Sequence, residues 1–144
     1  MSLSFQLKIV GASLLLLALA HAFFPRWFNW TEELGRLSSL NRQVFQIHCF
    51  FIGLILFLFG LLSLCFTDTL LERTPLARVV LGGLVFFWIA RLVVQLFVYD
   101  PSLWKGNRFN TRIHLLFSLM WAYYVAVFGW ALWEQLRPGQ RPGL

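Results

Sequence analysis

The stretch Val44–Phe66, VFQIHCFFIGLILFLFGLLSLCF, decides the fold, because it runs for 23 residues without a charged side chain. A helix needs ~20 apolar residues to cross the hydrocarbon core of a bilayer, so this segment is long enough to span it. Three more apolar stretches of similar length cover residues 5–24, 79–99 and 113–133. The sequence therefore predicts an all-α membrane protein whose four transmembrane helices form an up-down bundle.

The composition supports this class of protein and argues against a soluble domain. Of the 144 residues, 59% are hydrophobic and only 12% are charged, whereas an average soluble domain has about 25% charged residues. The net charge of +6 comes from basic residues that are scattered over loops and the tail. Contact with lipid head groups explains such a pattern better than a nucleic-acid partner does. We therefore expect membrane lipids as partners and no nucleic acid.

The connection after the first span has the pattern of a short amphipathic helix lying at the membrane interface. Aromatic side chains at its start are typical of the belt that anchors proteins at the water interface. A helix-start signal and leucines at every third position follow them. These residues are Trp27, Phe28 and Trp30, then Thr31, Glu32 and Glu33, then Leu34, Leu37 and Leu40.

The chain is predicted to form one transmembrane domain over residues 1–136, followed by a disordered tail over residues 137–144. Prolines fall just outside the apolar stretches, where helix breakers are expected. They are Pro25, Pro75, Pro101 and Pro138.

The first apolar stretch has a competing interpretation. Lys8 before an apolar core, with Ala20-His21-Ala22 at its end, also resembles a secretory signal with a small-residue cleavage site. Removing this stretch would leave three spans and would take one wall from any polar interior. The four-span interpretation is favoured, and the signal-peptide alternative stays open.

The sequence does not decide the orientation in the membrane or the redox compartment. Six basic residues flank the spans on one side and five on the other, which is no basis for a positive-inside assignment. Cys49 and Cys65 lie in one span, about 24 Å apart along a helix, so they cannot bridge each other. If the source is bacterial, the cell (inner) membrane is the expected location.

Polar residues that are unusual in a membrane protein gather toward one membrane face in the predicted topology. His21 lies near the end of the first span, His48 near the start of the second and His114 at the start of the fourth. Because these ends alternate, all three histidines are expected at the same face. The third span reaches that face with its second half, which carries Arg91 and Gln95.

Helical spacing places further polar and aromatic residues on the same stripes as these side chains. Residues separated by three, four or seven positions share a helix face, and lipid penalises a polar face turned outward. A shared inward-facing pocket is therefore expected. The stripes are Trp88, Arg91 and Gln95 on the third span, His114, Ser118 and Trp121 on the fourth, and Asn41 and His48 on the second.

Arg91 is the strongest clue to function. It lies about 12 Å inside the end of its span, where a charge costs at least ~2.5–3.5 kcal/mol on insertion scales. No acidic residue lies in the apolar core of any span, and Asp100 at the interface reaches it only partway. We expect the counter-ion to be a ligand with a carboxylate, phosphate or quinone-type oxygen. The alternative is that Arg91 bonds Gln95 and carbonyl groups and extends toward water.

The three histidines also fit a metal or haem site. Three imidazoles from His21, His48 and His114 hold zinc or copper with an open position. Two at matched depth on facing helices hold a haem, with Arg91 pairing a propionate. The short motifs HxxxH and HExxH are both absent, so each ligand would come from a different helix. The competing interpretation is interfacial histidines bonded to carbonyls or water.

Two function classes follow, and a third is disfavoured. In the first, a membrane enzyme or redox protein uses Arg91, Gln95, His48 and His114 on a quinone-like or anionic lipid substrate, for redox or lipid chemistry. Asn41, Trp88, Ser118 and Trp121 then line the cofactor or ligand pocket, with Asn41 orienting His48. In the second, the chain is a non-catalytic membrane subunit or a lipid-binding scaffold, with a membrane-protein partner or a second copy. The lack of internal repeats counts against a transporter.

Overall fold

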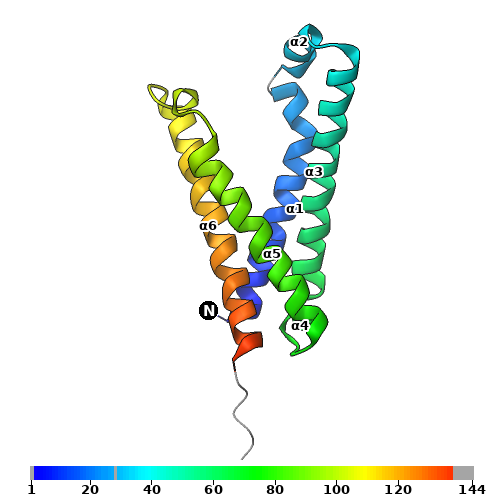
Figure 1. Ribbon diagram of the computed structural model, residues 1–144, viewed down its shortest axis with the longest axis vertical. Helices are drawn as coiled ribbons and strands as arrows, with labels where there is room; N and C mark the ends of the chain where they lie inside the picture. The colour runs from blue at the N-terminus through cyan, green and yellow to red at the C-terminus, as the bar shows by residue number, and fades with distance from the viewer. Residues whose placement is uncertain (1, 28, 138–144) are drawn as a thin grey trace, which may run out of the picture. The chain divides into compact units, whose positions relative to one another are not determined.

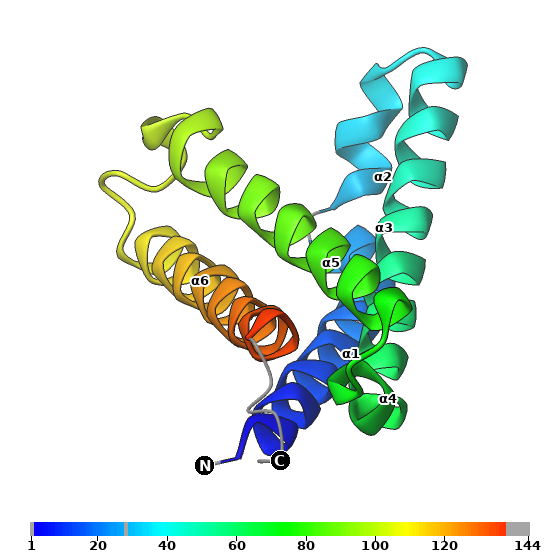
Figure 2. The same cartoon turned by 60° about the horizontal axis from the view of Figure 1, so that its bottom comes forward.

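The computed structural model describes residues 2–27 and 29–137, and in this part of the chain all regular structure is helical, with no strand. Figure 1 shows the path of the chain from blue to red, and Figure 2 shows it after a rotation. In order, the elements are α1 (Leu3–Trp27), α2 (Trp30–Glu33), η1 (Leu34–Arg36), α3 (Ser39–Cys65), α4 (Thr67–Leu71), α5 (Pro75–Val93), η2 (Val94–Val98), η3 (Pro101–Leu103) and α6 (Arg108–Leu136).

Four of these helices are long and apolar enough to cross a membrane, as the sequence predicts. They are α1, α3, α6 and the continuous helix Pro75–Val98 that α5 and η2 form together. Large apolar side chains stand exposed along them, for example Phe50 and Leu58 on α3 and Phe86 on α5. Water would penalise this exposure, whereas acyl chains match it. The chain therefore has the character of a multi-pass membrane protein.

The chain divides into two compact units. The N-terminal unit is Phe5–Thr67, and the C-terminal unit runs from Asp68 onward together with the first residues of the chain. The expectation of a single domain over residues 1–136 stays a prediction. The predicted disordered tail, residues 137–144, lies outside the described residues except for Arg137.

In the N-terminal unit, α1 and α3 cross at two glycines. A Cβ placed on Gly11 would lie 2.8 Å from the backbone nitrogen of Leu64 and 2.9 Å from the carbonyl oxygen of Gly60. A Cβ on Gly60 would lie 2.8 Å from the side chain of Leu15. Helices in lipid associate by close packing at such small residues, since burial from water contributes no driving force there. The crossing is therefore the contact that brings α1 and α3 together.

Three of the long helices, α3, α5 and α6, begin at side-chain caps. The Ser38 hydroxyl accepts the N–H of Asn41 at the start of α3, and the Thr74 hydroxyl accepts the N–H of Ala77 at the start of α5. Asn107 accepts two backbone N–H groups at the start of α6. Pro75 occupies the first turn of α5, where its missing N–H costs nothing.

One helix end differs from the sequence prediction. Pro25 lies inside α1, which continues to Trp27, although the apolar stretch itself ends before it. A proline removes one helical hydrogen bond. Because only two residues of α1 follow Pro25, the loss affects only the last turn of the helix. The chain then turns at Asn29, whose backbone is left-handed with φ 48°, a conformation that asparagine tolerates better than most residues.

The connection between α1 and α3 is helical but shorter than the leucine pattern indicates. It consists of the four-residue α2 and the 3-10 turn η1. Leu34 is buried, whereas Leu37 is exposed in the break before α3 and Leu40 is exposed on α3 itself. The leucines therefore do not form one continuous apolar face. Phe28, predicted as part of the aromatic belt, lies outside the described residues.

In the C-terminal unit, α5 and α6 pack through aromatic side chains. Trp88 of α5 stacks on Trp121 of α6, with ring centroids 5.1 Å apart, and meets the edge of Tyr124 at 4.8 Å. All three are buried, as is Phe128 one turn further along α6. Offset stacking and edge contacts of this kind add to the packing energy of the pair of helices.

A buried glutamine ties the end of α6 to the connection between α4 and α5. The Gln135 amide nitrogen donates to the carbonyl oxygens of Leu70 and Glu72, at 2.9 Å and 2.7 Å. These carbonyls lie at the end of α4, where helical partners run out. Sequence reasoning missed this residue, which looks like an ordinary interfacial glutamine.

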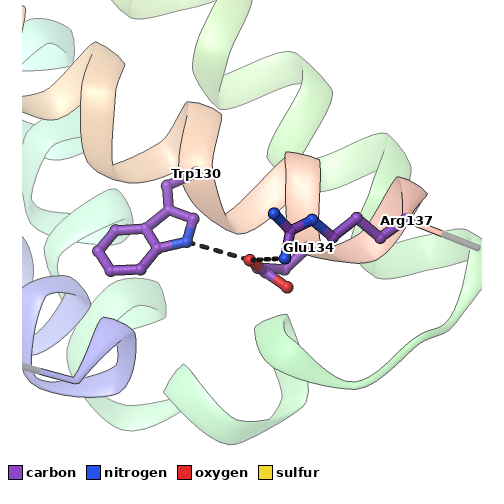
Figure 3. A network of polar contacts seen from close by, with 3 residues as sticks. All are labelled: Trp130, Glu134 and Arg137. Carbon is purple, nitrogen blue, oxygen red and sulfur yellow. Dashed lines mark hydrogen bonds and ion pairs between the residues drawn. The ribbon is translucent and has the colours of Figure 1, made fainter. Parts of the chain in front are cut away.

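Exposed polar side chains surround the end of α6. Figure 3 shows Glu134 accepting a hydrogen bond from the Trp130 indole at 3.2 Å and pairing with Arg137 at 3.4 Å. The Arg137 guanidinium also lies over the Trp133 ring. An exposed ion pair adds little stability, but tryptophan and arginine together are typical anchors at a membrane interface.

We predict that Gly11→Ala destabilises the protein by about 1–3 kcal/mol, because the new methyl group meets backbone atoms that cannot move aside. The measurement is thermal unfolding of the purified protein in detergent micelles. Gly82→Ala on α5 is the matched control, since a Cβ there meets nothing within 4 Å in the described structure. Equal melting temperatures for the two variants would contradict the crossing.

Candidate functional site

The candidate site forms where the end of the third long helix meets the first half of α6, wholly within the C-terminal unit. The chain leaves α-helical geometry at Val94 and winds as the π-helix η2 through Val98. Such wide turns inside α-helices are rare and often lie at functional sites. The turn carries Gln95, whose side chain is buried against α6. We call Arg91, Gln95, His114 and Trp121 the α5–α6 cluster.

Gln95 is the centre of this cluster. Its carbonyl oxygen Oε1 accepts from the Arg91 guanidinium at 3.2 Å and from the Trp121 indole nitrogen at 3.4 Å. Its amide nitrogen Nε2 lies 2.8 Å from Nδ1 of His114. One side chain therefore joins two residues of α6 to a charged residue of α5.

The donors in this network determine which way the amide points and which ring nitrogen of His114 carries the proton. Arginine and the tryptophan indole can only donate hydrogen bonds, so Oε1 of Gln95 must face Arg91 and Trp121. The NH₂ group then faces His114 and donates to Nδ1. In the neutral imidazole the proton consequently resides on Nε2. His114 thus has on its other side an N–H donor that no side chain or carbonyl of the described residues accepts.

His114 is held by a flat aromatic contact as well as by Gln95. The Trp104 ring stacks on the imidazole with centroids 3.8 Å apart and planes inclined by 10°. Trp104 follows η3, and Thr111 fastens its backbone by donating to the Trp104 carbonyl at 2.8 Å. Sequence reasoning missed Trp104, because a residue in an irregular loop follows no helical period. The only indication of its role in the sequence is that an aromatic residue lies ten positions before His114.

Arg91 lies in an aromatic setting without an acidic partner. Its guanidinium is 4.9 Å from the centroid of the Trp121 ring and 5.8 Å from that of Tyr99. Its hydrogen bond to Gln95 uses one of its N–H groups. Among the described residues, the ion pair is formed by Glu134 and Arg137, and it does not involve Arg91. The remaining N–H groups of Arg91 are therefore without a carboxylate there.

Asp100, the nearest acid in sequence, is engaged elsewhere. Its carboxylate caps η3 by accepting the backbone N–H of Ser102 at 2.8 Å. This hydrogen bond from the Ser102 backbone lowers the pKa of Asp100 below its usual value, and a side-chain contact with Ser102 and the charge of Lys105 act in the same direction. Asp100 therefore stays ionised as a loop cap.

A further donor without a partner lies beside the cluster. Trp88 is 1% exposed, and its indole nitrogen has no hydrogen-bond partner in the described part of the chain. Burying an N–H group without an acceptor is costly, and native structures rarely do so without a reason. Trp88 stacks directly on Trp121, so this donor lies next to the α5–α6 cluster.

The structure thus brings together five of the residues singled out from the sequence, namely Trp88, Arg91, Gln95, His114 and Trp121. Ser118 lies one turn beyond His114, but its hydroxyl donates to the His114 carbonyl at 2.8 Å. It therefore acts within its own helix. The hydrogen bond between Arg91 and Gln95 is the one predicted by the alternative interpretation, in which groups of the protein itself bond the guanidinium.

The other predicted residues belong to the N-terminal unit. Nδ1 of His21 lies 2.8 Å from the carbonyl oxygen of Leu17, and Nδ1 of His48 lies 2.7 Å from that of Val44. Asn41 is exposed, and the His48 contact is with Val44 rather than with Asn41. Both histidines therefore find a partner on their own helix.

The structure gives no support to the predicted metal or haem site. Over residues 2–27 and 29–137, no group of three His, Cys, Asp or Glu side chains is placed to hold a metal ion. A cavity shared by His21, His48 and His114 would join residues of different units. That convergence stays a prediction from the sequence.

Comparison with protein-family models, with curated proteins and with solved structures gives no match for this chain. The function is therefore inferred from the geometry of the site alone.

We predict that Gln95→Leu destabilises the protein by about 1–2 kcal/mol, because it removes two interhelical hydrogen bonds and leaves the Trp121 indole and the His114 Nδ1 without partners. Thermal unfolding in micelles measures the effect. Gln43→Leu, an exposed glutamine of α3, is the control and should change stability by less than about 0.5 kcal/mol. A Gln95→Leu protein as stable as this control would show that the cluster does not hold α5 and α6 together.

Proposed function

We propose that this protein is an up-down four-helix membrane protein, with a short interfacial helix after the first span, that binds an anionic lipid through the α5–α6 cluster. The proposed ligand is membrane-resident and carries a phosphate or carboxylate group. If the source is bacterial, the proposed location is the cell (inner) membrane.

The observation that carries this proposal is that the cluster offers only hydrogen-bond donors. Over residues 2–27 and 29–137, the cluster's groups without a partner are the remaining N–H groups of Arg91 and Nε2–H of His114, and the buried indole N–H of Trp88 lies beside them. The two acceptors in the cluster are already occupied, since Oε1 of Gln95 accepts from two donors and Nδ1 of His114 accepts from the Gln95 amide. Donors without partners favour a ligand with acceptor oxygens.

The charge of Arg91 favours an anion over a neutral acceptor. Arg91 lies seven residues before the end of its helix at Val98, about 10 Å by helical rise. A charge inside a membrane segment is expensive, and such residues usually pair with an opposite charge or line a polar cavity. A phosphate or carboxylate accepts hydrogen bonds from the guanidinium and also neutralises its charge. A quinone oxygen accepts hydrogen bonds but leaves the charge unpaired.

The arrangement around Arg91 and His114 holds these donors in place before a ligand arrives. Gln95 bonds both residues, Trp104 stacks on the imidazole, and Trp121 lies under the guanidinium. Side chains that are already ordered lose little entropy on binding. These contacts support binding of a head group, which corresponds to the lipid-binding function considered from the sequence.

We predict that the purified protein prefers phosphatidylglycerol to phosphatidylcholine, and that Arg91→Gln reduces this preference about tenfold through loss of charge-assisted hydrogen bonds. Native mass spectrometry of the protein in detergent with each added lipid gives the populations. Arg112→Gln is the matched control, because Arg112 is an exposed arginine of the same unit outside the cluster.

Three outcomes would overturn the proposal. One is equal binding of the two lipids by the unaltered protein. Another is an equal loss of phosphatidylglycerol in the Arg91→Gln and Arg112→Gln variants, which would indicate a general effect of basic charge. The third is retention of a ubiquinone-type molecule in preference to either lipid, which would move the site to the quinone-binding class.

A further inference from the structure

We propose a second binding site, in the N-terminal unit, for an amphiphile with one acyl chain and an anionic head group. The site is a cavity of about 650 Å³ lined by α1, α2, η1 and α3. Small-molecule sites usually enclose about 300–1,000 Å³. All of its lining residues belong to Phe5–Thr67, so this site is independent of the α5–α6 cluster.

The polarity of the lining changes along the cavity. Toward α2 and the start of α3 it includes Thr31, Arg42 and Gln46, and further along α3 it includes Leu54 and Phe57. The part of the cavity beyond the polar end runs from Gln46 to Phe57, about 16 Å by helical rise. One leaflet of the hydrocarbon core is about 15 Å deep, half of the ~30 Å thickness of the whole. The apolar part therefore has the length that a single acyl chain occupies in a membrane.

The polar end of the cavity has hydrogen-bonding groups to offer. Within the described structure, the side chains of Thr31, Arg42 and Gln46 make no hydrogen bond or ion pair with the protein. The acids nearest in sequence are Glu32 and Glu33, and Glu32 accepts from the Asn29 amide instead of pairing with Arg42. A guanidinium with a hydroxyl and an amide beside it suits a carboxylate or a phosphate.

Gly53 makes room in the wall of the cavity. A Cβ at this position would meet only the Cβ of His21, at 3.5 Å, which is an ordinary van der Waals distance. An alanine therefore fits without strain, whereas a larger side chain must take up cavity volume. This property makes Gly53 the position at which the cavity can be filled with least effect on the crossing at Gly11 and Gly60.

The two cysteines of the chain provide an internal comparison. Cys49 lines the cavity and is partly exposed, whereas Cys65 is exposed at the end of α3 and is not part of the lining. An occupant of the cavity shields Cys49 and leaves Cys65 unchanged. Single-cysteine proteins, made by Cys65→Ser or Cys49→Ser, allow each rate of maleimide modification to be measured separately in detergent.

We predict that palmitate slows modification of Cys49 about tenfold at saturation and does not alter that of Cys65. Gly53→Leu should abolish the protection and Gly53→Ala should retain it, while Gly82→Leu on α5 serves as the control for a larger side chain elsewhere. Equal slowing of both cysteines would indicate simple partitioning into the micelle and would overturn the site. So would full protection in the Gly53→Leu protein, provided that it elutes as a single folded species.

Head-group recognition is tested with hexadecanol, which has the same chain length and no charge. Arg42→Gln should reduce the apparent affinity for palmitate about tenfold without changing that for hexadecanol, and Arg36→Gln should change neither. Equal affinity of the unaltered protein for palmitate and hexadecanol would overturn the anionic part of the proposal. Lysophosphatidylglycerol, compared with palmitate under the same conditions, tells whether the anion comes from a phospholipid or a free fatty acid.

Discussion

The acceptor oxygen of Gln95 is the atom on which the α5–α6 cluster depends. Lipid offers no hydrogen bonds, so a polar side chain within a span must find its partner inside the protein. Gln95 meets this requirement for Arg91 and Trp121 with its oxygen and for His114 with its amide group. Since the two obligate donors fix the amide, they also fix the imidazole tautomer. A single glutamine thereby determines how the polar groups of the cluster are oriented.

The sequence was sufficient to predict the class of fold and part of the site. Four uncharged or nearly uncharged stretches predicted four long helices, because the thickness of the bilayer sets their length. The helical spacing of Trp88, Arg91 and Gln95 predicted a shared stripe, and these residues do act in one cluster. Both predictions use a period or a length, which the sequence displays directly.

Other features could not be predicted because they depend on contacts between distant segments. The crossing at Gly11 and Gly60 is visible only when α1 lies against α3. The π-helical turn at Val94–Val98 has no residue signature, and Gln135 acts on carbonyls more than 60 residues away in the chain. A cavity is likewise a property of packing. The charge of Arg91 is therefore visible in the sequence, whereas the space beside Gly53 is not.

The three histidines show why a count of similar residues at one membrane face is weak evidence for a metal site. A helix carbonyl that already accepts its regular hydrogen bond still has a second lone pair. An imidazole four residues later can donate to it, as His21 does to Leu17 and His48 to Val44. Such a histidine has its hydrogen-bond partner on its own helix and needs none from a neighbouring helix. His114 instead accepts from Gln95 on another helix, so its ring has a position that only the tertiary structure can supply. A residue whose partner lies across a helix interface, rather than one turn back, is therefore the better indicator of a site.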